Sequence, residues 1–437
     1  MKYVVREIDV RSADGREQLL RVSQYTGVTQ RRGIGGSDVP DTRAESLVGY
    51  KRVEPQDLVV NIMLAWNGSM AVSKYCGITS PAYCVYRFAP DLNPWYFHSL
   101  LRSPIYKARI KASSTGVVES RLRLYSDDLN RIEAMLPPPN EQAAIVRFLG
   151  WADGRLERTI QAKRRVIALL TEQKQAIIQR GVTRGLDSSA SLRSSEIPWL
   201  GDIPVHWETR RVKQVSRVLR GKFSHRPRND PSLYDGVYPF IQTGVVAQAA
   251  KYITGYSQTL NDKGLAVSKL FPKGTLVMTI AANIGEVAVL TFDACFPDSI
   301  VGFVPSQIVD RDYLYLVFRC MKPELLREAP VNTQGNLNVE RIGAMGIPLP
   351  PISEQIQIVQ RIEAEVALFD SGIDRLKREI ALLREYRVRL TTDVITGKLD
   401  VRLAAACLPG ESEHDDGGGQ PDQEDAESEL TDEEAEA

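Results

Sequence analysis

The amino-acid sequence predicts an α+β fold with two domains of mixed strands and helices, separated by two long antiparallel coiled-coil helices and followed by a disordered acidic tail. Three observations predict it: a repeated segment, heptad spacing of apolar residues in both copies, and short strand-like runs before each copy. The predicted boundaries are a first domain at 1–136, a helix at 137–182, a linker at 183–196, a second domain at 197–348, a helix at 349–400 and the tail at 404–437.

The repeat begins at Glu141-Gln142 and recurs at Glu354-Gln355. It continues at a constant offset and without a gap to Asp187 and Asp400, and about 14 of the 47 aligned pairs are identical. An ungapped match of this length indicates one supersecondary unit used twice.

Each copy opens on a proline cluster, Pro137–Pro139 and Pro348–Pro351. Proline is excluded from helix interiors, so the clusters predict helix starts, with Asn140 and Ser353 as N-caps. Gly181 with Gly185, and Gly397, are typical of helix ends. Each helix would run for about 40 residues, or about 60 Å at 1.5 Å per residue.

Apolar residues recur every three or four positions in both copies, and this spacing places them on one stripe of each helix. Asp153, Lys163, Lys174 and Arg387 interrupt the stripes. The matched length and register favour pairing of the two helices within one chain, and two independent dimerisation helices are the alternative. The predicted interface residues are Val146, Leu149, Leu156, Ile160, Ile167, Leu170 and Ile177 in the first copy and Val359, Ile362, Val366, Phe369, Ile373, Leu376, Ile380, Leu383 and Leu390 in the second.

The segments before the two helices share a layout but little sequence. Strand-like runs at 57–63 and 274–280 lead to loops containing Gly68 and Gly285, and further strand follows each loop. Aromatic helices are predicted at 94–101 and 311–318, and Val212–Val215 is predicted as strand. The pattern indicates similar helices that carry two different domains.

The formal net charge is zero, but the charges are unevenly distributed along the chain. The segment 403–437 holds 13 acidic residues and no Lys or Arg, which leaves 55 basic against 55 − 13 = 42 acidic residues before it. A body of about +13 suits a polyanionic partner. The tail has the composition of a disordered segment.

Several classes of protein are disfavoured. No apolar run is long enough to span a membrane, and the five cysteines form no C-x-x-C pair, which fits a reducing cytoplasm. No P-loop or dinucleotide fingerprint occurs, and the four histidines are dispersed. Asn93-Pro94-Trp95-Tyr96 is similar to an amino-methyltransferase motif, but a helix start is the better interpretation.

The order of these features resembles the specificity subunit of type I restriction-modification systems over about residues 1–402. The resemblance rests on the two proline-led "E-Q" helices, on Leu186-Asp187 and Leu399-Asp400, and on Ile197-Pro198-Trp199-Leu200-Gly201 with Ile203-Pro204 and His206-Trp207. The first domain has no counterpart of Ile197–Arg220, which suggests that a segment of comparable length lies upstream or is missing.

The resemblance implies two target recognition domains that each read half of a split DNA sequence. It also implies that the two helices dock methylation subunits, of which there are two, and that restriction subunits join the same core. S-adenosylmethionine and ATP with Mg²⁺ would bind in those partner subunits, with no cofactor, metal or catalytic residue in this chain. A coiled-coil scaffold without DNA binding and a stand-alone DNA-modifying enzyme are the alternatives.

Candidate DNA contacts are polar side chains that bond base edges or phosphates and that lie in loops with Gly or Pro. They are Gln30, Arg31, Arg32, Asn67, Ser114 and Thr115 in the first domain, and Lys222, His225, Arg226, Arg228, Asn283, Thr333, Gln334 and Asn336 in the second.

Overall fold

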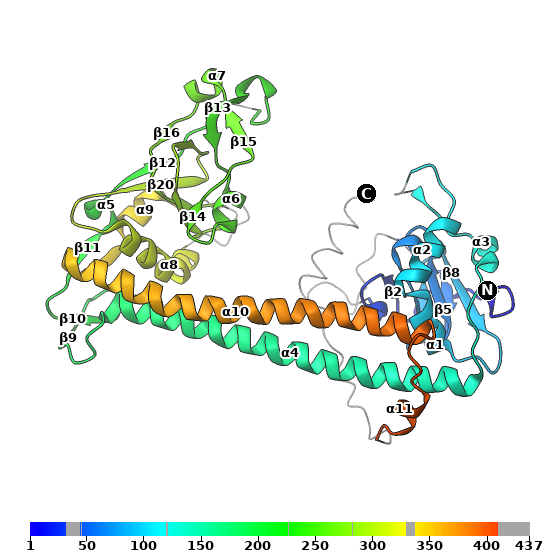
Figure 1. Cartoon of the computed structure of the whole chain (residues 1–437). Coiled ribbons are helices and arrows are strands. Elements are labelled where there is room, and N and C mark those ends of the chain that lie inside the picture. The colour runs from blue at the N-terminus through cyan, green and yellow to red at the C-terminus, as the bar shows by residue number, and fades with distance from the viewer. Residues whose placement is uncertain are drawn as a thin grey trace. The chain divides into compact units, whose positions relative to one another are not determined.

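A computed structural model of the chain describes residues 1–31, 44, 46–118, 121–225, 227–281, 283–328 and 337–409. These residues fall into two compact units, which share the two long helices α4 (Pro139–Arg184) and α10 (Ile352–Ile395) (Figure 1). The first unit comprises Met1–Lys163 and Arg378–Ala437, and the second comprises Arg164–Lys377. The acidic tail that was predicted to be disordered lies outside the described residues from position 410 onward.

The first unit is a small α+β body built on a four-stranded antiparallel sheet in the order β1-β8-β5-β6. Two further strand pairs, β2-β3 and β4-β7, complete its strands. Its elements are β1 (Val5–Ile8), β2 (Leu20–Ser23), β3 (Gly27–Gln30), β4 (Lys51–Val53), β5 (Leu58–Asn61), η2 (Ala65–Asn67), β6 (Met70–Val72), β7 (Gly77–Thr79), β8 (Tyr83–Phe88), α1 (Pro94–Leu101), α2 (Pro104–Ser113), α3 (Ser126–Arg131) and α11 (Arg402–Ala406).

The second unit is larger and carries a five-stranded sheet in the order β12-β20-β17-β18-β14 and a four-stranded sheet in the order β15-β13-β19-β16. Two-stranded pairs β10-β9 and β11-β21 lie outside these sheets. Its elements are β9 (Leu192–Ser194), β10 (Asp202–Pro204), β11 (Glu208–Arg211), α5 (Val212–Val215), β12 (Ser216–Arg220), η4 (Pro231–Leu233), β13 (Tyr234–Phe240), α6 (Thr243–Gln248), β14 (Tyr252–Ile253), β15 (Gln258–Leu260), α7 (Asp262–Ala266), β16 (Leu270–Phe271), β17 (Leu276–Thr279), β18 (Val287–Leu290), β19 (Ala294–Cys295), β20 (Ile300–Pro305), α8 (Arg311–Glu328), α9 (Val339–Ala344) and β21 (Gly346–Leu349).

Each unit has a hydrophobic core that includes one end of each long helix. In the first unit, Leu149 of α4 and Val394 of α10 are buried with Phe97 of α1 and with the sheet. In the second, Val182 of α4 and Ile358 of α10 are buried with the side chains of α8. Burial of these apolar side chains is the main force that attaches each domain to the helices.

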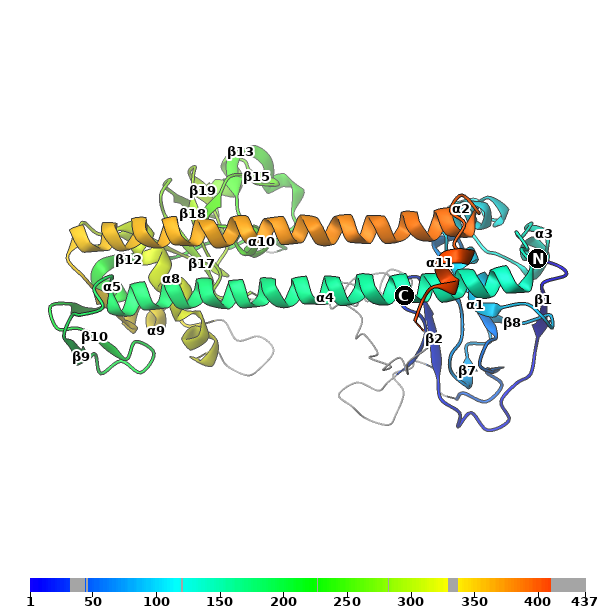
Figure 2. The same ribbon diagram turned by 60° about the horizontal axis from the view of Figure 1, so that its bottom comes forward.

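The α+β fold with two long antiparallel helices is confirmed, and so are the predicted aromatic helices α1 and α8. Figure 2 shows α4 and α10 side by side from a second direction. Their antiparallel register is fixed by cross-helix ion pairs, Arg387–Asp153 at 3.0 Å and Lys163–Glu379 at 2.5 Å in the first unit. The polar residues that interrupt the heptads therefore pair with charges on the facing helix.

The predicted N-caps Asn140 and Ser353 are wrong. In each copy a proline carbonyl oxygen before the helix accepts the first helical hydrogen bond, from Gln142 N to Pro138 O at 3.0 Å and from Gln355 N to Pro351 O at 3.0 Å. Proline suits this position because its fixed φ is compatible with a helix start and it has no N–H to satisfy.

Two other local predictions are also wrong. Gly181 does not end α4: it is inside the helix, where a Cβ would lie 2.6 Å from Ile362 Cδ1 on the facing helix. Gly185, with φ +71°, follows the last helical residue and is the helix stop. Val212–Val215 forms the helical turn α5 instead of a strand, because Val212 and Val215 are both buried at a spacing of three.

Candidate nucleic-acid interface

The glutamine of the "E-Q" motif mounts the first domain on α4. Gln142 is fully buried: its Oε1 accepts the N–H of Asn93 at 2.9 Å, and its Nε2 donates to the Pro137 carbonyl at 2.8 Å. Asn93 is the N-cap of α1, and Tyr96 in the first turn of α1 donates its hydroxyl to the Met135 carbonyl at 3.2 Å. The start of α1 is thereby bonded to the proline segment and to the first turn of α4.

The second domain is mounted on α10 by the same set of bonds. Gln355 is fully buried: its Oε1 accepts the N–H of Asp310 at 2.7 Å, and its Nε2 donates to the Pro350 carbonyl at 2.8 Å. Asp310 caps α8, and Tyr313 donates its hydroxyl to the Pro348 carbonyl at 3.4 Å. Burial raises the pKa of both tyrosines, so each phenol stays a neutral donor.

The structural repeat therefore extends beyond the segment that aligns in sequence. When the offset of the repeat is extended backward along the chain, Pro137 and Met135 align with Pro350 and Pro348, and their carbonyls accept equivalent bonds. We call this arrangement the mounting joint. It places two domains of different sequence on the two helices in the same local way.

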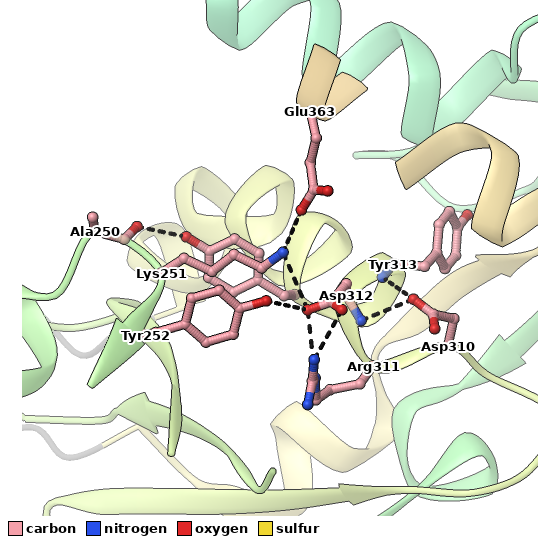
Figure 3. A network of polar contacts seen from close by, with 9 residues as sticks. Ala250, Lys251, Tyr252, Asp310, Arg311, Asp312, Tyr313 and Glu363 are labelled. Carbon is pink, nitrogen blue, oxygen red and sulfur yellow. Dashed lines mark hydrogen bonds and ion pairs between the residues drawn. The ribbon is translucent and has the colours of Figure 1, made fainter. Parts of the chain in front are cut away.

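The second domain also contacts α10 through a lysine network (Figure 3). The Lys251 ammonium lies 2.5 Å from Glu363 of α10 and 3.2 Å from Asp312 of α8. It also lies over the rings of Tyr252 and Tyr315, 5.1 and 5.6 Å from their centroids. These contacts raise the pKa of Lys251 despite the opposing effect of its burial, so the lysine is a permanent cation in this network.

In the first domain, the structure brings Asn67 together with two lysines of α2. Gly68 has φ +104° and packs on Lys107, because a Cβ at this position would lie 2.5 Å from Lys107 Cε. Lys111 lies over the Trp66 ring, 5.5 Å from its centroid. Burial and the nearby Arg102 lower the pKa of Lys107. We call Trp66, Asn67, Lys107 and Lys111 the α2 basic cluster.

Ser114 and Thr115 follow directly at the C-terminal end of α2. The Ser114 hydroxyl donates to the Ile110 carbonyl at 2.8 Å and so ends the helix, while Thr115 exchanges two backbone bonds of 2.9 Å with Arg123. Thr115 is exposed, whereas Ser114 is half-buried and serves the helix end. Of the two, Thr115 is the better placed to contact a ligand.

Gln30 and Arg31 are not brought to the α2 basic cluster. They lie at the open end of the β2-β3 hairpin, where Gln30 pairs with Leu20. The turn at the other end of that hairpin lies nearer to the cluster. Arg102 connects the two, because it donates to the Tyr25 carbonyl of the turn at 3.1 Å and to the Gly68 carbonyl at 3.3 Å. Burial lowers the pKa of Arg102 to about 10. Arg32 lies outside the described residues.

In the second domain, Lys222, His225 and Arg228 share the loop between β12 and η4. Lys222 and Arg228 are exposed. His225 Nε2 lies 3.0 Å from Asp230, and Arg228 lies 2.6 Å from Asp298. These carboxylates hold His225 and Arg228 in place, and the Asp298 carboxylate offsets the charge of Arg228. Arg226 lies outside the described residues.

Asn283 occupies the β17–β18 turn, in a setting that matches Asn67. Gly285 has φ +81°, and a Cβ there would lie 3.0 Å from Lys322 of α8, which also pairs with Glu286. Each domain thus has an Asn in a turn whose left-handed glycine packs on a helical lysine. Thr333, Gln334 and Asn336 lie outside the described residues.

The sequence prediction missed Trp66, Lys107, Lys111 and Lys322. Lys107 and Lys111 are spaced i, i+4, which indicates one helix face and was a usable signal. Their meeting with Trp66, which lies much earlier in the chain, depends on the tertiary packing of α2 on η2.

The predicted interface residues of the two long helices are all buried or half-buried. Leu149 and Ile160 in α4 and Ile362, Ile373 and Ile380 in α10 are among the buried ones. Other apolar side chains of the same helices point outward: Leu169 is 53% exposed, Leu368 76% and Leu382 63%. The helices therefore retain apolar outer faces beyond the stripe that they use for each other.

The described residues contain no group of three or more His, Cys, Asp or Glu that could hold a metal ion. Asn93, the residue of the methyltransferase-like motif, uses its side chain to accept the N–H of Trp95 at 3.0 Å as an N-cap. None of the described helices combines the length and apolar character needed to cross a membrane.

Comparisons with known proteins agree with these features. Residues 204–380 match the family model of the type I restriction modification DNA specificity domain. The chain is 23% identical over 375 residues to the type I restriction enzyme MjaVIII specificity subunit of Methanocaldococcus jannaschii, covering 81% of this chain and 83% of that protein. It is 22% identical over 370 residues to the EcoDI specificity subunit of Escherichia coli, covering 79% of each.

A solved chain from a structure on the assembly and conformational transition of the type I R-M system has the same fold. It superposes with a TM-score of 0.66 at 16% sequence identity, covering 91% of this chain and 98% of that chain. This likeness supports the fold, while the sequence matches support the family. Over most of its length the chain is similar to the specificity subunits of type I restriction-modification systems, and residues 204–380 match their DNA specificity domain.

Proposed function

We propose that this chain binds double-stranded DNA through its two domains, that each domain reads one half of a split target, and that the chain performs no chemistry itself. The observation that carries the proposal is the mounting joint. A joint repeated at both helix starts presents two domains of unlike sequence in the same way, as expected of a scaffold that holds two different readers.

The side chains support DNA as the ligand. The α2 basic cluster combines two lysines, an aromatic ring and an Asn in one place, and the β12–η4 loop carries Lys222 and Arg228. Lysine and arginine neutralise phosphates, and Asn bonds adenine edges in the major groove. The body's excess of 13 basic residues acts in the same direction.

We further propose that the outer faces of α4 and α10 dock methylation subunits, with restriction subunits joining the same assembly. The outward-pointing Leu169, Leu368 and Leu382 support this proposal. Exposed apolar side chains on a helix are typical of surfaces that bind another protein. Under this proposal S-adenosylmethionine and ATP with Mg²⁺ bind in those subunits.

The direct test is methylome sequencing of cells that express this chain with its methylation subunit. Methylated adenine in both halves of one split motif is the expected result, and cells without this chain are the control. Co-purification of the subunits with no sequence-specific methylation would instead support the alternative of a scaffold without DNA recognition.

A binding assay separates the remaining alternative. The purified chain alone should bind DNA with an affinity that falls steeply with salt, and it should not retain S-adenosylmethionine or ATP. Stoichiometric retention of S-adenosylmethionine would favour a stand-alone modifying enzyme and contradict the proposal.

A further inference from the structure

The first unit contains a cavity of about 720 Å³ between the turn after β6, helix α1 and helix α4. Val146 and Gly150 of α4 form one wall, and Lys74, Trp95 and His98 form the opposite one. The cavity also reaches Asp153, whose carboxylate pairs with Arg387 at 3.0 Å.

Lys74 gives the cavity its positive charge. His98 accepts the N–H of Val72 through Nδ1 at 3.2 Å, and its pKa is lowered to about 3 by burial and by Arg102 and Lys74, so it is neutral. The Lys74 ammonium lies over the Trp95 ring, 5.8 Å from its centroid. Among the described residues, no carboxylate pairs with it.

In the second unit, a lysine from a different place in the fold also lies over an aromatic ring and contacts two carboxylates. Lys251 contacts the carboxylates of Asp312 and Glu363 (Figure 3). Asp312 is the second residue after the α8 N-cap, and its counterpart after the α1 N-cap is Trp95. Glu363 aligns with Gly150 in the ungapped repeat.

Two carboxylate-bearing positions of the second unit are therefore an indole and a glycine in the first, and of these the glycine leaves space open in the cavity wall. A Cβ at Gly150 would meet nothing within 4 Å. The space that Glu363 fills in the second unit is open in the first, beside an ammonium group that lacks a carboxylate.

The described chain ends beside this cavity. Arg147 of α4 donates to the carbonyls of Leu408 and Pro409 at 2.9 and 3.2 Å, and its neighbour Val146 lines the cavity. Arg147 and Gly150 are about 4.5 Å apart along the helix axis. Residues 410–437 then continue the chain with 13 carboxylates and no Lys or Arg.

We propose that the cavity is a binding site for an acidic side chain of residues 411–437 of this same chain, with Lys74 as its counter-ion. The tail's carboxylate takes the place that Glu363 holds in the second unit. The site requires no DNA and no partner subunit, so it can be tested independently of the proposed function.

Zero-length carbodiimide cross-linking of the full chain tests the contact, because it joins an amine to a carboxylate only at direct contact. Trypsin then releases the tail as residues 403–437, because no Lys or Arg follows Arg402. The expected product joins this peptide to Lys74, in large excess over Lys111, an exposed lysine of the same unit. Equal yields at Lys74 and Lys111 would overturn the proposal.

A matched pair of variants tests the site itself. Gly150→Glu supplies the missing carboxylate and should reduce the Lys74–tail cross-link about tenfold, as expected of an internal competitor favoured by about 1.4 kcal/mol. Gly150→Gln has nearly the same size and helix propensity but no charge, and it should leave the cross-link intact. An equal loss in both variants would show that bulk alone blocks the contact and would overturn the role of charge.

Mixing isotope-labelled and unlabelled chains identifies the source of the tail. Cross-links confined to single chains are expected. Cross-links between labelled and unlabelled chains would assign the contact to a second copy and overturn the intramolecular proposal.

Discussion

Single buried polar residues decide how the domains attach to the long helices. A fully buried glutamine is uncommon, because each unmet hydrogen bond in its amide costs free energy. Gln142 and Gln355 are fully buried, and both ends of each amide are bonded to backbone groups. The glutamine of the repeated "E-Q" pair is thus a structural connection.

Gln355→Ala should destabilise the second unit by about 3 kcal/mol, because it removes three hydrogen bonds and leaves the half-buried N–H of Asp310 without a partner. Chemical denaturation would measure the loss, and hydrogen exchange should locate it at the start of α8. Gln357→Ala, at an exposed position on the same helix, is the control and should change stability by less than about 0.5 kcal/mol. Equal effects of the two substitutions would exclude the joint as a stabilising element.

His98 should make the first unit sensitive to acid. Its pKa is lowered from 6.5 to about 3 in the folded chain, so between these values the unfolded chain binds a proton that the folded chain does not. This contribution to stability is fully present above pH 6.5 and is lost as the pH falls, by about 1.4 kcal/mol per pH unit.

The measurement is the free energy of unfolding at pH 6.5 and 4.5 for the wild type and for His98→Asn, which keeps an acceptor for Val72 N–H but cannot be protonated. The wild type should lose about 2–3 kcal/mol more than the variant over this interval. Parallel losses in the two proteins would mean that His98 does not stay neutral in the folded chain.

At the scale of elements, α4 and α10 are specified by apolar stripes and aligned by charges. The stripes alone would tolerate several registers, whereas Lys174–Asp370, Lys163–Glu379 and Arg387–Asp153 are each satisfied in one antiparallel register. Charge pairs at the margin of a helix seam often determine register and orientation in this way.

Ile373→Asp should destabilise the second unit by more than about 3 kcal/mol, since it places an unpaired carboxylate in the buried seam. Leu368→Asp on the same helix is the control: Leu368 is 76% exposed, so its thermal unfolding should be nearly unchanged. Similar melting temperatures for both variants would count against the predicted stripe as the interface.

The same two variants separate folding from assembly. If the outer faces dock methylation subunits, Leu368→Asp should weaken co-purification with those subunits while the chain itself stays folded. Full retention of the subunits would place the docking surface elsewhere.

At the scale of the whole molecule, if each domain reads half of the DNA target as proposed, the two domains should act independently, because each lies in its own compact unit. Asn67→Ala should relax base preference in one half of the DNA target and Asn283→Ala in the other, each by about 1–3 kcal/mol if the residue reads a base. The double variant should show the sum of the two effects.

Methylome sequencing of the two single variants and the double variant measures the base preference in each half of the target. Relaxation of both halves by one single substitution would contradict independent readers. A uniform loss on all sequences would reassign the residue to phosphate contact.

The sequence by itself determined the features that depend on local periodicity and composition. The repeat, the two long helices, the aromatic helices α1 and α8 and the turns at Gly68 and Gly285 were all predicted, because spacing and turn residues are visible along the chain. The details of the helix starts and the turn at Val212–Val215 were mispredicted, since they depend on which backbone groups are already satisfied by neighbours.

Tertiary structure decided what meets across the chain. The joint that bonds Gln142 to Asn93, the cluster of Trp66 with Lys107 and Lys111, and the cavity beside Lys74 unite residues that are far apart in the sequence. Hydrogen bonds and cation–π contacts form only between groups a few ångströms apart, and a cavity is defined by the side chains that surround it. A sequence pattern cannot show them until the chain has packed.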